Sequence, residues 1–372
     1  MPVQTLSALK LNRALLARQG LLARKRMSVR AAIHAAGGLQ SQEPKDPYVA
    51  LWSRISGFRA ERLREAAQRR EVVRGSYLRC TIHTVSVDDF VAFRPLLQPV
   101  IDRELVSHRA ELGGFDPLQL EAEARALMAG APMTARQMGE ALAARFPQAQ
   151  PNGLAYWIRT CIALAMVPGD DRWGYPRPPR FVPAEQWLGR PLAERGPDGS
   201  GAIDGLLLRG LAAIGPAGSA DLRAWSGLNA IKPALEAMRP RLRCFRDEAG
   251  RELFDLPDAP RPRPDTVAPV RFLPEFDNTL LSHVDRSRVI PPRHAPRFAM
   301  AANGRRERAV LVDGFVRAVW NHVRVRDTAT LRVRLFEPLP GATVDEVSAE
   351  AEALLRFLEP DAGAYEVQVR HD

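Results

Sequence analysis

The stretch Val72-Val73-Arg74-Gly75-Ser76-Tyr77-Leu78-Arg79-Cys80-Thr81-Ile82-His83-Thr84-Val85 decides the fold class. Val72 and Val73 begin a predicted strand, Gly75-Ser76 is a turn signal, and residues 78–85 alternate apolar and polar side chains as a second strand does. The segments before this hairpin are predicted helices, at 5–18, 28–36, 47–57 and 60–70. Helices followed by a β-hairpin predict a winged helix-turn-helix.

The same order of elements occurs twice more along the chain. The second set has predicted helices at 117–129, 134–146 and 152–166, then a short hairpin with Gly169-Asp170-Asp171 at its turn. The third set has predicted helices at 203–213, 219–226 and 229–239, then strands near 241–246 and 251–256. The repetition lies in the order of elements and not in the residues themselves.

A proline-rich segment, 257–269, follows and is predicted to be a linker. Beyond it the pattern is mostly β, with predicted strands at 270–274, 278–282, 309–313, 315–320, 330–337 and 364–370 and a helix at 344–358. The sequence therefore predicts an α+β protein with three tandem winged helix-turn-helix domains and a C-terminal mostly-β domain. The expected boundaries are 1–95, 96–195, 196–258 and 259–372.

Composition indicates a soluble protein with an anionic partner. The net charge is +10 and the pI is about 10.2, which favours nucleic acid, although the arginine bias of a GC-rich genome produces such values without selection for binding. The three cysteines are far apart and form no metal or disulfide pattern, so we expect a protein of the reducing cytoplasm with no metal or other cofactor. The expected nucleic-acid partner would associate it with the nucleoid. No apolar run is long enough to predict export or a membrane span.

Two glutamines stand out within the first domain. Residues 1–42 contain seven Lys/Arg and no Asp or Glu, and they end in Gly37-Gly38-Leu39-Gln40-Ser41-Gln42. In an extended backbone, residues two apart point to one side, so Gln40 and Gln42 could converge beside a bound polyanion. The spacing alone is weak, because Gln148 and Gln150 repeat it in what is predicted to be an ordinary loop.

The chain resembles the winged-helix DNA glycosylases of the AlkZ type, over essentially its whole length. The residues that carry the resemblance are Leu39-Gln40-Ser41-Gln42 with Pro44 and Pro47-Tyr48, Trp52-Ser53-Arg54-Ile55, Leu78-Arg79-Cys80-Thr81-Ile82-His83, Gly215-Pro216-Ala217 with Asp221 and Trp225-Ser226-Gly227, Leu273-Pro274-Glu275-Phe276-Asp277-Asn278, Ser282-His283-Val284-Asp285-Arg286-Ser287-Arg288-Val289-Ile290, Val312-Asp313-Gly314 and Val319-Trp320. The Asp-Asn and Ser-His-x-Asp-Arg-Ser-Arg block is the most specific part.

This resemblance implies three tandem winged-helix domains, a C-terminal β domain and catalytic roles for Gln40 and Gln42. Gln42, where a sister branch has Asp, places the chain with the branch that resembles bacterial glycosylases of bulky adducts and interstrand crosslinks, often found beside genes for DNA-alkylating natural products. Two positions differ from the usual pattern: Ser41 stands where an apolar residue is common, and Cys80 where glycine is common.

The chemistry of glutamine narrows the substrate class. A side-chain amide is essentially non-basic near pH 7, so it cannot act as a general base. Alkylation at N7 or N3 of a purine makes the base a cationic leaving group, and the protein then needs only to position water and stabilise an oxocarbenium-like sugar. Only four of the basic residues are lysines, and none lies beside an acid-and-base set, so we expect monofunctional hydrolysis rather than lyase chemistry.

Six further residues are candidate DNA contacts, each with a structural alternative. Arg54, Arg79 and His83 could contact phosphate or the lesion, or could be solvated surface arginines and a satisfied strand histidine. His283, Arg286 and Arg288 could clamp the DNA backbone, or could form an internal salt-bridge network with Asp277 and Asp285. The tryptophans Trp52, Trp225 and Trp320 are predicted to lie in the core.

The sequence thus predicts a monomeric DNA glycosylase acting on duplex DNA that contains alkylated purines. The alternatives are a winged-helix transcription factor and a self-resistance protein that sequesters adducts without cutting them. Both alternatives predict salt-sensitive DNA binding, but a pure binder loses little when Gln40 and Gln42 become alanine.

Overall fold

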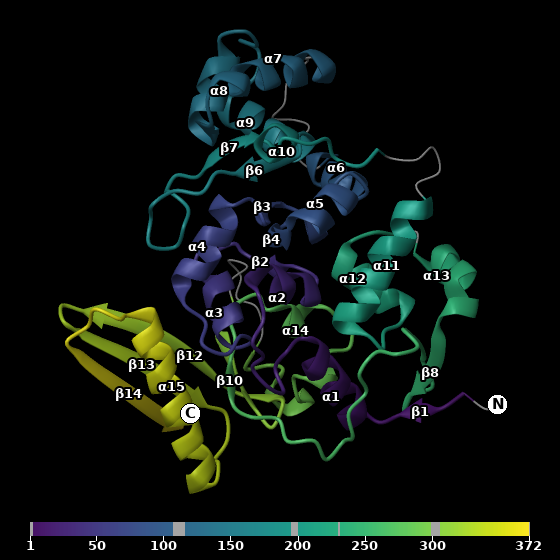
Figure 1. Cartoon of the computed structure of the whole chain (residues 1–372), viewed down its shortest axis with the longest axis vertical. Coiled ribbons are helices and arrows are strands. Elements are labelled where there is room, and N and C mark those ends of the chain that lie inside the picture. Colours follow the sequence, from purple (N-terminus) through teal and green to yellow (C-terminus); the bar gives the residue numbers. More distant parts are fainter. Residues whose placement is uncertain (1–2, 107–115, 195–199, 230, 299–305, 372) are drawn as a thin grey trace.

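The computed structural model describes residues 3–106, 116–194, 200–229, 231–298 and 306–371. Figure 1 shows one helix-and-strand unit in the middle of the molecule, a second above it and a third to its right, and a larger sheet, covered by one long helix, at the C-terminal end. The described strands form three three-stranded sheets and one five-stranded sheet. The mixed α+β class predicted from the sequence is confirmed.

The first unit places the glutamine motif on a sheet edge. Its helices are α2 (Val29–Ala35), α3 (Asp46–Trp52) and α4 (Ala60–Gln68), and its strands are β2 (Leu39–Gln40), β3 (Val72–Ser76) and β4 (Ile82–Ser86), in the order β2-β4-β3. The predicted turn at Gly75-Ser76 is wrong: both residues are paired within β3, and the chain reverses through a 3₁₀ turn, η1 (Leu78–Cys80). Gly75 is small for a packing reason, because a Cβ there would lie 2.5 Å from the carbonyl oxygen of Leu164.

Two helices, α5 (Val87–Phe93) and α6 (Gln98–Val106), lead to the second unit. This unit contains α7 (Pro117–Gly130), α8 (Ala135–Ala143), α9 (Pro151–Cys161) and α10 (Ala184–Leu188), with strands β5 (Met133–Thr134), β6 (Leu164–Met166) and β7 (Arg180–Pro183). The predicted helix 152–166 therefore runs too far. It ends at Cys161, because Leu164–Met166 pairs with Phe181–Pro183 as an antiparallel strand.

The third unit recruits the N-terminus of the chain. Its elements are α11 (Ser200–Ile214), α12 (Ser219–Ser226), α13 (Lys232–Met238), the 3₁₀ turn η3 (Arg239–Arg241), β8 (Arg243–Asp247) and β9 (Glu252–Asp255). Strand β1 (Thr5–Leu6) pairs parallel with β8, and α1 (Ala8–Arg18) begins only after the Ser7 cap, so the predicted helix start at residue 5 is wrong. Figure 1 shows β1 beside β8, far along the sequence from it.

The C-terminal sheet has the order β10-β11-β12-β13-β14. Its strands are β10 (Arg271–Phe272), β11 (Arg308–Val312), β12 (Phe315–Val325), β13 (Thr328–Leu335) and β14 (Ala364–His371), and the helix is α15 (Gly341–Leu358). The predicted strand 278–282 is instead a short helix, α14 (Asn278–Leu281), because the Asp277 carboxylate caps the Thr279 N–H. Two further 3₁₀ turns follow it, η4 (Arg286–Arg288) and η5 (Pro292–His294).

The arginines of the cationic first segment are largely neutralised within the protein. Four of them pair with carboxylates from distant segments: Arg13 with Asp313, Arg18 with Asp255, Arg24 with Glu350 and Arg30 with Asp88. The Arg18–Asp255 pair is fully buried, at 2.7 Å. An absence of acids in a stretch of sequence therefore does not make that stretch a free cationic surface.

Trp225 and Trp320 lie in the core, as predicted, and Trp52 is half-buried under the Arg24 guanidinium. Among the residues that the structure describes, no helix combines the length and apolar character needed to cross a bilayer. The same residues contain no group of three His, Cys, Asp or Glu placed to hold a metal ion.

Candidate active site

The glutamine motif directly follows a rigid glycine turn, Gly37-Gly38. Gly37 and Gly38 both have left-handed backbone, with φ of 72° and 93°. A Cβ on Gly37 would lie 3.2 Å from the Trp225 ring, so the third unit packs directly on this turn. The Asn278 amide donates to the carbonyl oxygens of Gly38 at 2.6 Å and Ala36 at 3.1 Å. The turn is thus fixed before any DNA binds.

Gln40, at the end of β2, is held against the tip of the β3–β4 hairpin. It lies opposite His83 in the β2–β4 pairing and is 8% exposed. Its Oε1 accepts a hydrogen bond of 2.9 Å from Arg79 Nη2, and Arg79 Nη1 donates to the Trp225 carbonyl oxygen at 2.6 Å. Burial, with a smaller contribution from nearby Arg286, lowers the pKa of Arg79 to about 10. Arg79 therefore remains a cation at neutral pH and ties Gln40 to the third unit.

His83 supports this arrangement as a neutral side chain. Its Nδ1 is 3.0 Å from the Thr81 carbonyl oxygen, so Nδ1 carries the proton, and Nε2 presents a lone pair 3.5 Å from Arg79 Nη2. Burial and the Arg79 charge lower the pKa of His83 to about 3. His83 is therefore no general acid near pH 7, and its described contacts match those of a satisfied strand histidine.

Gln42 ends on the same hairpin tip. Its side chain is exposed, and its Oε1 accepts a 2.9 Å hydrogen bond from the Ile82 N–H. The intervening Ser41 is fully buried, and its hydroxyl lies 2.8 Å from the Thr84 hydroxyl, which explains a small polar residue here. In the part of the chain that the structure describes, neither glutamine Nε2 has a hydrogen-bond partner.

Arg74 fixes the backbone between the two glutamines. Its guanidinium donates to the Ser41 carbonyl oxygen at 2.7 Å and lies over the Tyr175 ring, 4.9 Å from the centroid. Sequence reasoning missed Arg74 and Asn278 as supports of the motif. Asn278 lay in the block that carries the resemblance, but nothing in the spacing showed that it reaches Gly38.

The chain reversal at η1 explains why glycine would suit the position of Cys80. Arg79 and Cys80 both have φ of 56°, in the left-handed region where a side chain is strained. Glycine adopts this conformation freely, so the glycine that the resemblance leads us to expect at the position of Cys80 would have a backbone cause. The strand geometry on either side is regular in this chain despite the cysteine.

Of the other predicted DNA contacts, Arg54 is internal. It is 3% exposed, and its guanidinium donates to Asp277 Oδ1 at 2.8 Å, to Gln19 Oε1 at 3.2 Å and to the Ala50 carbonyl oxygen at 3.0 Å. The network carries on to the glycine turn, since Gln19 Nε2 also donates to the carbonyl oxygen of Ala36, the residue before Gly37, at 3.4 Å. These contacts give Arg54 a positioning role, and a contact with DNA stays a prediction.

The three candidate DNA contacts in the loop that follows α14 differ in burial. His283 and Arg288 are buried, with His283 Nε2 3.0 Å from the Ile214 carbonyl oxygen and Arg288 Nη1 donating to the Pro216 carbonyl oxygen at 3.1 Å. Arg286 is exposed, and its side chain has no hydrogen bond or ion pair with any residue the structure describes. Arg286 is thus the member of this set whose side chain is presented to solvent.

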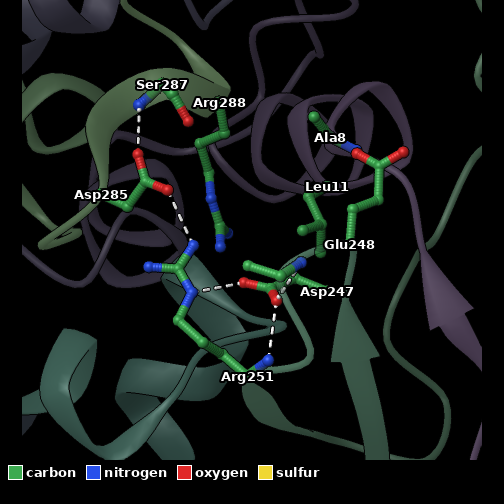
Figure 2. A pocket seen from close by; sticks show the side chains of 9 residues that line it. Ala8, Leu11, Asp247, Glu248, Arg251, Asp285, Ser287 and Arg288 are labelled. Carbon is green, nitrogen blue, oxygen red and sulfur yellow. Dashed lines mark hydrogen bonds and ion pairs between the residues drawn. The ribbon is translucent and has the colours of Figure 1, made fainter.

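Figure 2 shows the base of this loop, beside Arg288. Arg251 bridges the Asp247 carboxylate at 2.6 Å and the Asp285 carboxylate at 2.7 Å, and Asp285 also accepts the Ser287 N–H. The Ser287 N–H bond, which caps η4, and the Arg251 contact help lower the pKa of Asp285 to about 2, against the effect of burial. Of the predicted network, Asp285 holds Arg251 and Asp277 holds Arg54, so neither pairs with His283, Arg286 or Arg288.

Asp46, four residues after Gln42, is a fully buried carboxylate. Neither of its oxygens has a hydrogen-bond partner among the described residues, and burial raises its pKa to about 7. The folded state therefore binds a proton that the unfolded state releases near pH 4. Folding stability is lost as pH rises from about 4 through about 7, by up to about 4 kcal/mol from this group alone.

We expect Asp46→Asn to remove this pH dependence. The Asn side chain has nearly the same shape and carries no charge, so the variant should melt higher than wild type at pH 8 and near it at pH 5. Thermal unfolding at both pH values measures the difference. A difference that does not grow with pH would mean that Asp46 is charged throughout.

Comparison with known proteins identifies the family of this chain. The family described as DNA glycosylase AlkZ-like matches residues 33–357, which is most of the chain. The chain belongs to the AlkZ-like DNA glycosylase family. AlkZ-like DNA glycosylases are hydrolases of N-glycosyl bonds in DNA, so the chain is an enzyme of DNA repair and DNA is its substrate.

Among solved structures, the chain is similar to the DNA glycosylase AlkZ of Streptomyces sahachiroi. The TM-score is 0.78 at 19% sequence identity, and the match covers 99% of this chain and 100% of that one. At this identity the likeness establishes a shared fold. No curated protein sequence matches.

Proposed function

We propose that this AlkZ-like enzyme is a monofunctional glycosylase for cationic alkylated purines in duplex DNA, with Gln40 and Gln42 as its catalytic residues. N7-alkylguanines, bulky adducts and interstrand crosslinks share the required leaving group. The observation that carries the proposal is the pair of side-chain amides pinned on one hairpin tip, with Oε1 of Gln40 on Arg79 and Oε1 of Gln42 on the Ile82 N–H.

Each amide oxygen keeps one acceptor lone pair for the reaction. A carbonyl oxygen accepts two hydrogen bonds, and the protein supplies one donor to each. The free lone pairs can orient a water molecule and direct partial negative charge toward the sugar. The C1′–N bond breaks and its electrons neutralise the base. The water oxygen bonds to C1′, and its proton passes to solvent.

The DNA contacts follow from exposure. We place Arg286 on the DNA backbone, because it is exposed, unpaired among described residues and near Arg79. Arg79 is half-buried at the site and holds Gln40. Arg54, His83, His283 and Arg288 are buried, and we propose that they position the motif and its surrounding loop.

We propose that the three small units are winged-helix modules with the predicted boundaries, acting together in one monomer on chromosomal DNA in the cytoplasm. Family membership favours an enzyme over a transcription factor or an adduct-sequestering protein. General repair and self-resistance to an alkylating natural product both fit this chemistry.

Alkali dependence tests the proposal. Wild type should release 7-methylguanine from a labelled duplex in a single turnover, and the strand should break only after alkaline treatment of the abasic site. Lys45 is the lysine nearest the motif in sequence, and burial lowers its pKa, so Lys45→Ala is the matched control. Strand cleavage without alkali that Lys45→Ala abolishes would reveal a lyase and contradict the monofunctional mechanism.

A further inference from the structure

A pocket of about 420 Å³ opens between η4 and η5. Its lining combines apolar and charged side chains, namely Val284, Ile290, Pro292, Ala295, Phe298, Asp285, Arg286, Ser287 and Arg306. The volume is that of sites that take small aromatic molecules. None of the contacts that hold Gln40 and Gln42 uses this space.

Two physical links connect the pocket with the glutamines. Arg286 lines the pocket and lies close enough to Arg79, the partner of Gln40, to contribute to its lowered pKa. The Arg306 N–H donates to Glu275 Oε1 at 3.0 Å, and Glu275 lies three residues before Asn278, which holds the Gly38 carbonyl oxygen at 2.6 Å. The segment from Glu275 to Asn278 therefore anchors both the pocket wall and the glycine turn.

The pocket is chemically prepared for a ligand. Val284 is 61% exposed, although it is a large apolar side chain, and Phe298 is buried beneath the Arg306 guanidinium, 5.1 Å from its ring centroid. Arg306 Nη1 is buried without a hydrogen-bond partner among the described residues. A buried guanidinium nitrogen without an acceptor is costly, and an apolar surface with such a donor fits an aromatic group that carries an oxygen acceptor.

We propose that this pocket is a subsite for the non-base part of a bulky adduct, an aromatic group attached to the alkylated purine. The inference rests on the proposed function, because the purine must occupy the neighbouring glutamine site. The apolar wall of Val284, Ile290 and Phe298 packs on the aromatic group, and Arg306 donates to its acceptor atom. A methyl adduct leaves the subsite empty, so excision of 7-methylguanine does not depend on it.

The test fills the pocket and compares two substrates. Ala295→Trp and, separately, Val284→Trp place an indole in the pocket from exposed positions that hold no catalytic contact. The probes are duplexes with a single 7-methylguanine or a single 7-benzylguanine carrying a ring carboxylate. We expect both variants to excise the benzyl adduct about 10- to 100-fold more slowly than wild type and the methyl adduct at the wild-type rate. Ala353→Trp, at an exposed position of α15, is the matched control for adding an indole.

The outcomes separate the two proposals. Unchanged excision of both adducts by the pocket variants would overturn the subsite, and so would equal loss of both, which would show a general effect on DNA binding or folding. If wild type releases neither base, the proposed function itself fails. Loss confined to the benzyl adduct, with Ala353→Trp unaffected, establishes the subsite.

Discussion

Gln40→Ala and Gln42→Ala should each slow single-turnover release of 7-methylguanine by about a hundred- to a thousandfold. Each substitution removes an amide dipole that the folded protein holds in place before the reaction, so that no free energy is spent on orienting it during the reaction. The double variant should lose less than the product of the two effects, because both amides act on the same water and sugar. DNA affinity, measured by fluorescence anisotropy, should stay within a few-fold of wild type, since neither side chain is charged.

The chain contains its own control for this prediction. Gln148 and Gln150 have the same spacing, and both are exposed in the connection between α8 and α9. Gln148→Ala/Gln150→Ala should release the base at the wild-type rate. Equal loss of activity in both double variants would trace the effect to general destabilisation. Full activity in Gln40→Ala/Gln42→Ala would remove the amides from the mechanism.

Arg54→Met should lower stability far more than DNA affinity. It leaves the buried Asp277 carboxylate without its cation, and loss of one partner from a buried ion pair costs about 3–5 kcal/mol. We expect a fall in Tm of roughly 5 °C or more. Because Asp277 also caps α14, which holds the glycine turn through Asn278, that turn loses part of its support, and base release should slow as well.

Arg286→Met is the matched comparison, because it removes the same side-chain charge from an exposed position. Its Tm should stay near wild type, while the slope of log affinity against log salt should become shallower by about 1. Salt titrations of duplex binding and thermal melts on both variants give the four values. A shallower salt slope for Arg54→Met with an unchanged Tm would place Arg54 on the DNA instead.

The sequence was sufficient where the signal is local. Alternation along Ile82–Ser86 and helical spacing along α3 and α4 predicted the order of elements in the first unit, and the predicted strands 309–313 and 315–320 correspond to the β11–β12 hairpin. The error at Gly75 has a tertiary cause. Its missing side chain admits the Leu164 carbonyl of the second unit, and a lone glycine in a strand indicates a turn and a close approach equally well.

The residues that support the candidate site could not be predicted from the sequence, for a different reason. Asn278 meets Gly38 across 240 residues, and Arg54 meets Asp277 across 223, and no local period encodes such pairs. The arginines of the first segment misled for the same reason, since the acid that neutralises Arg18 lies 237 residues away. Gln40 and Gln42 could be named from the sequence because the resemblance, and not their spacing, distinguished them from Gln148 and Gln150.

Dependence on the charge of the leaving group tests amide catalysis without a general base. Wild type and Gln40→Ala/Gln42→Ala should be compared, at enzyme excess, on matched duplexes that carry 7-methylguanine or uracil at one position. The mechanism predicts release of the cationic base by wild type, far slower release by the double variant, and no release of neutral uracil by either protein. Release of uracil at a rate near that of 7-methylguanine would show that the enzyme activates a neutral leaving group, which two amides cannot do.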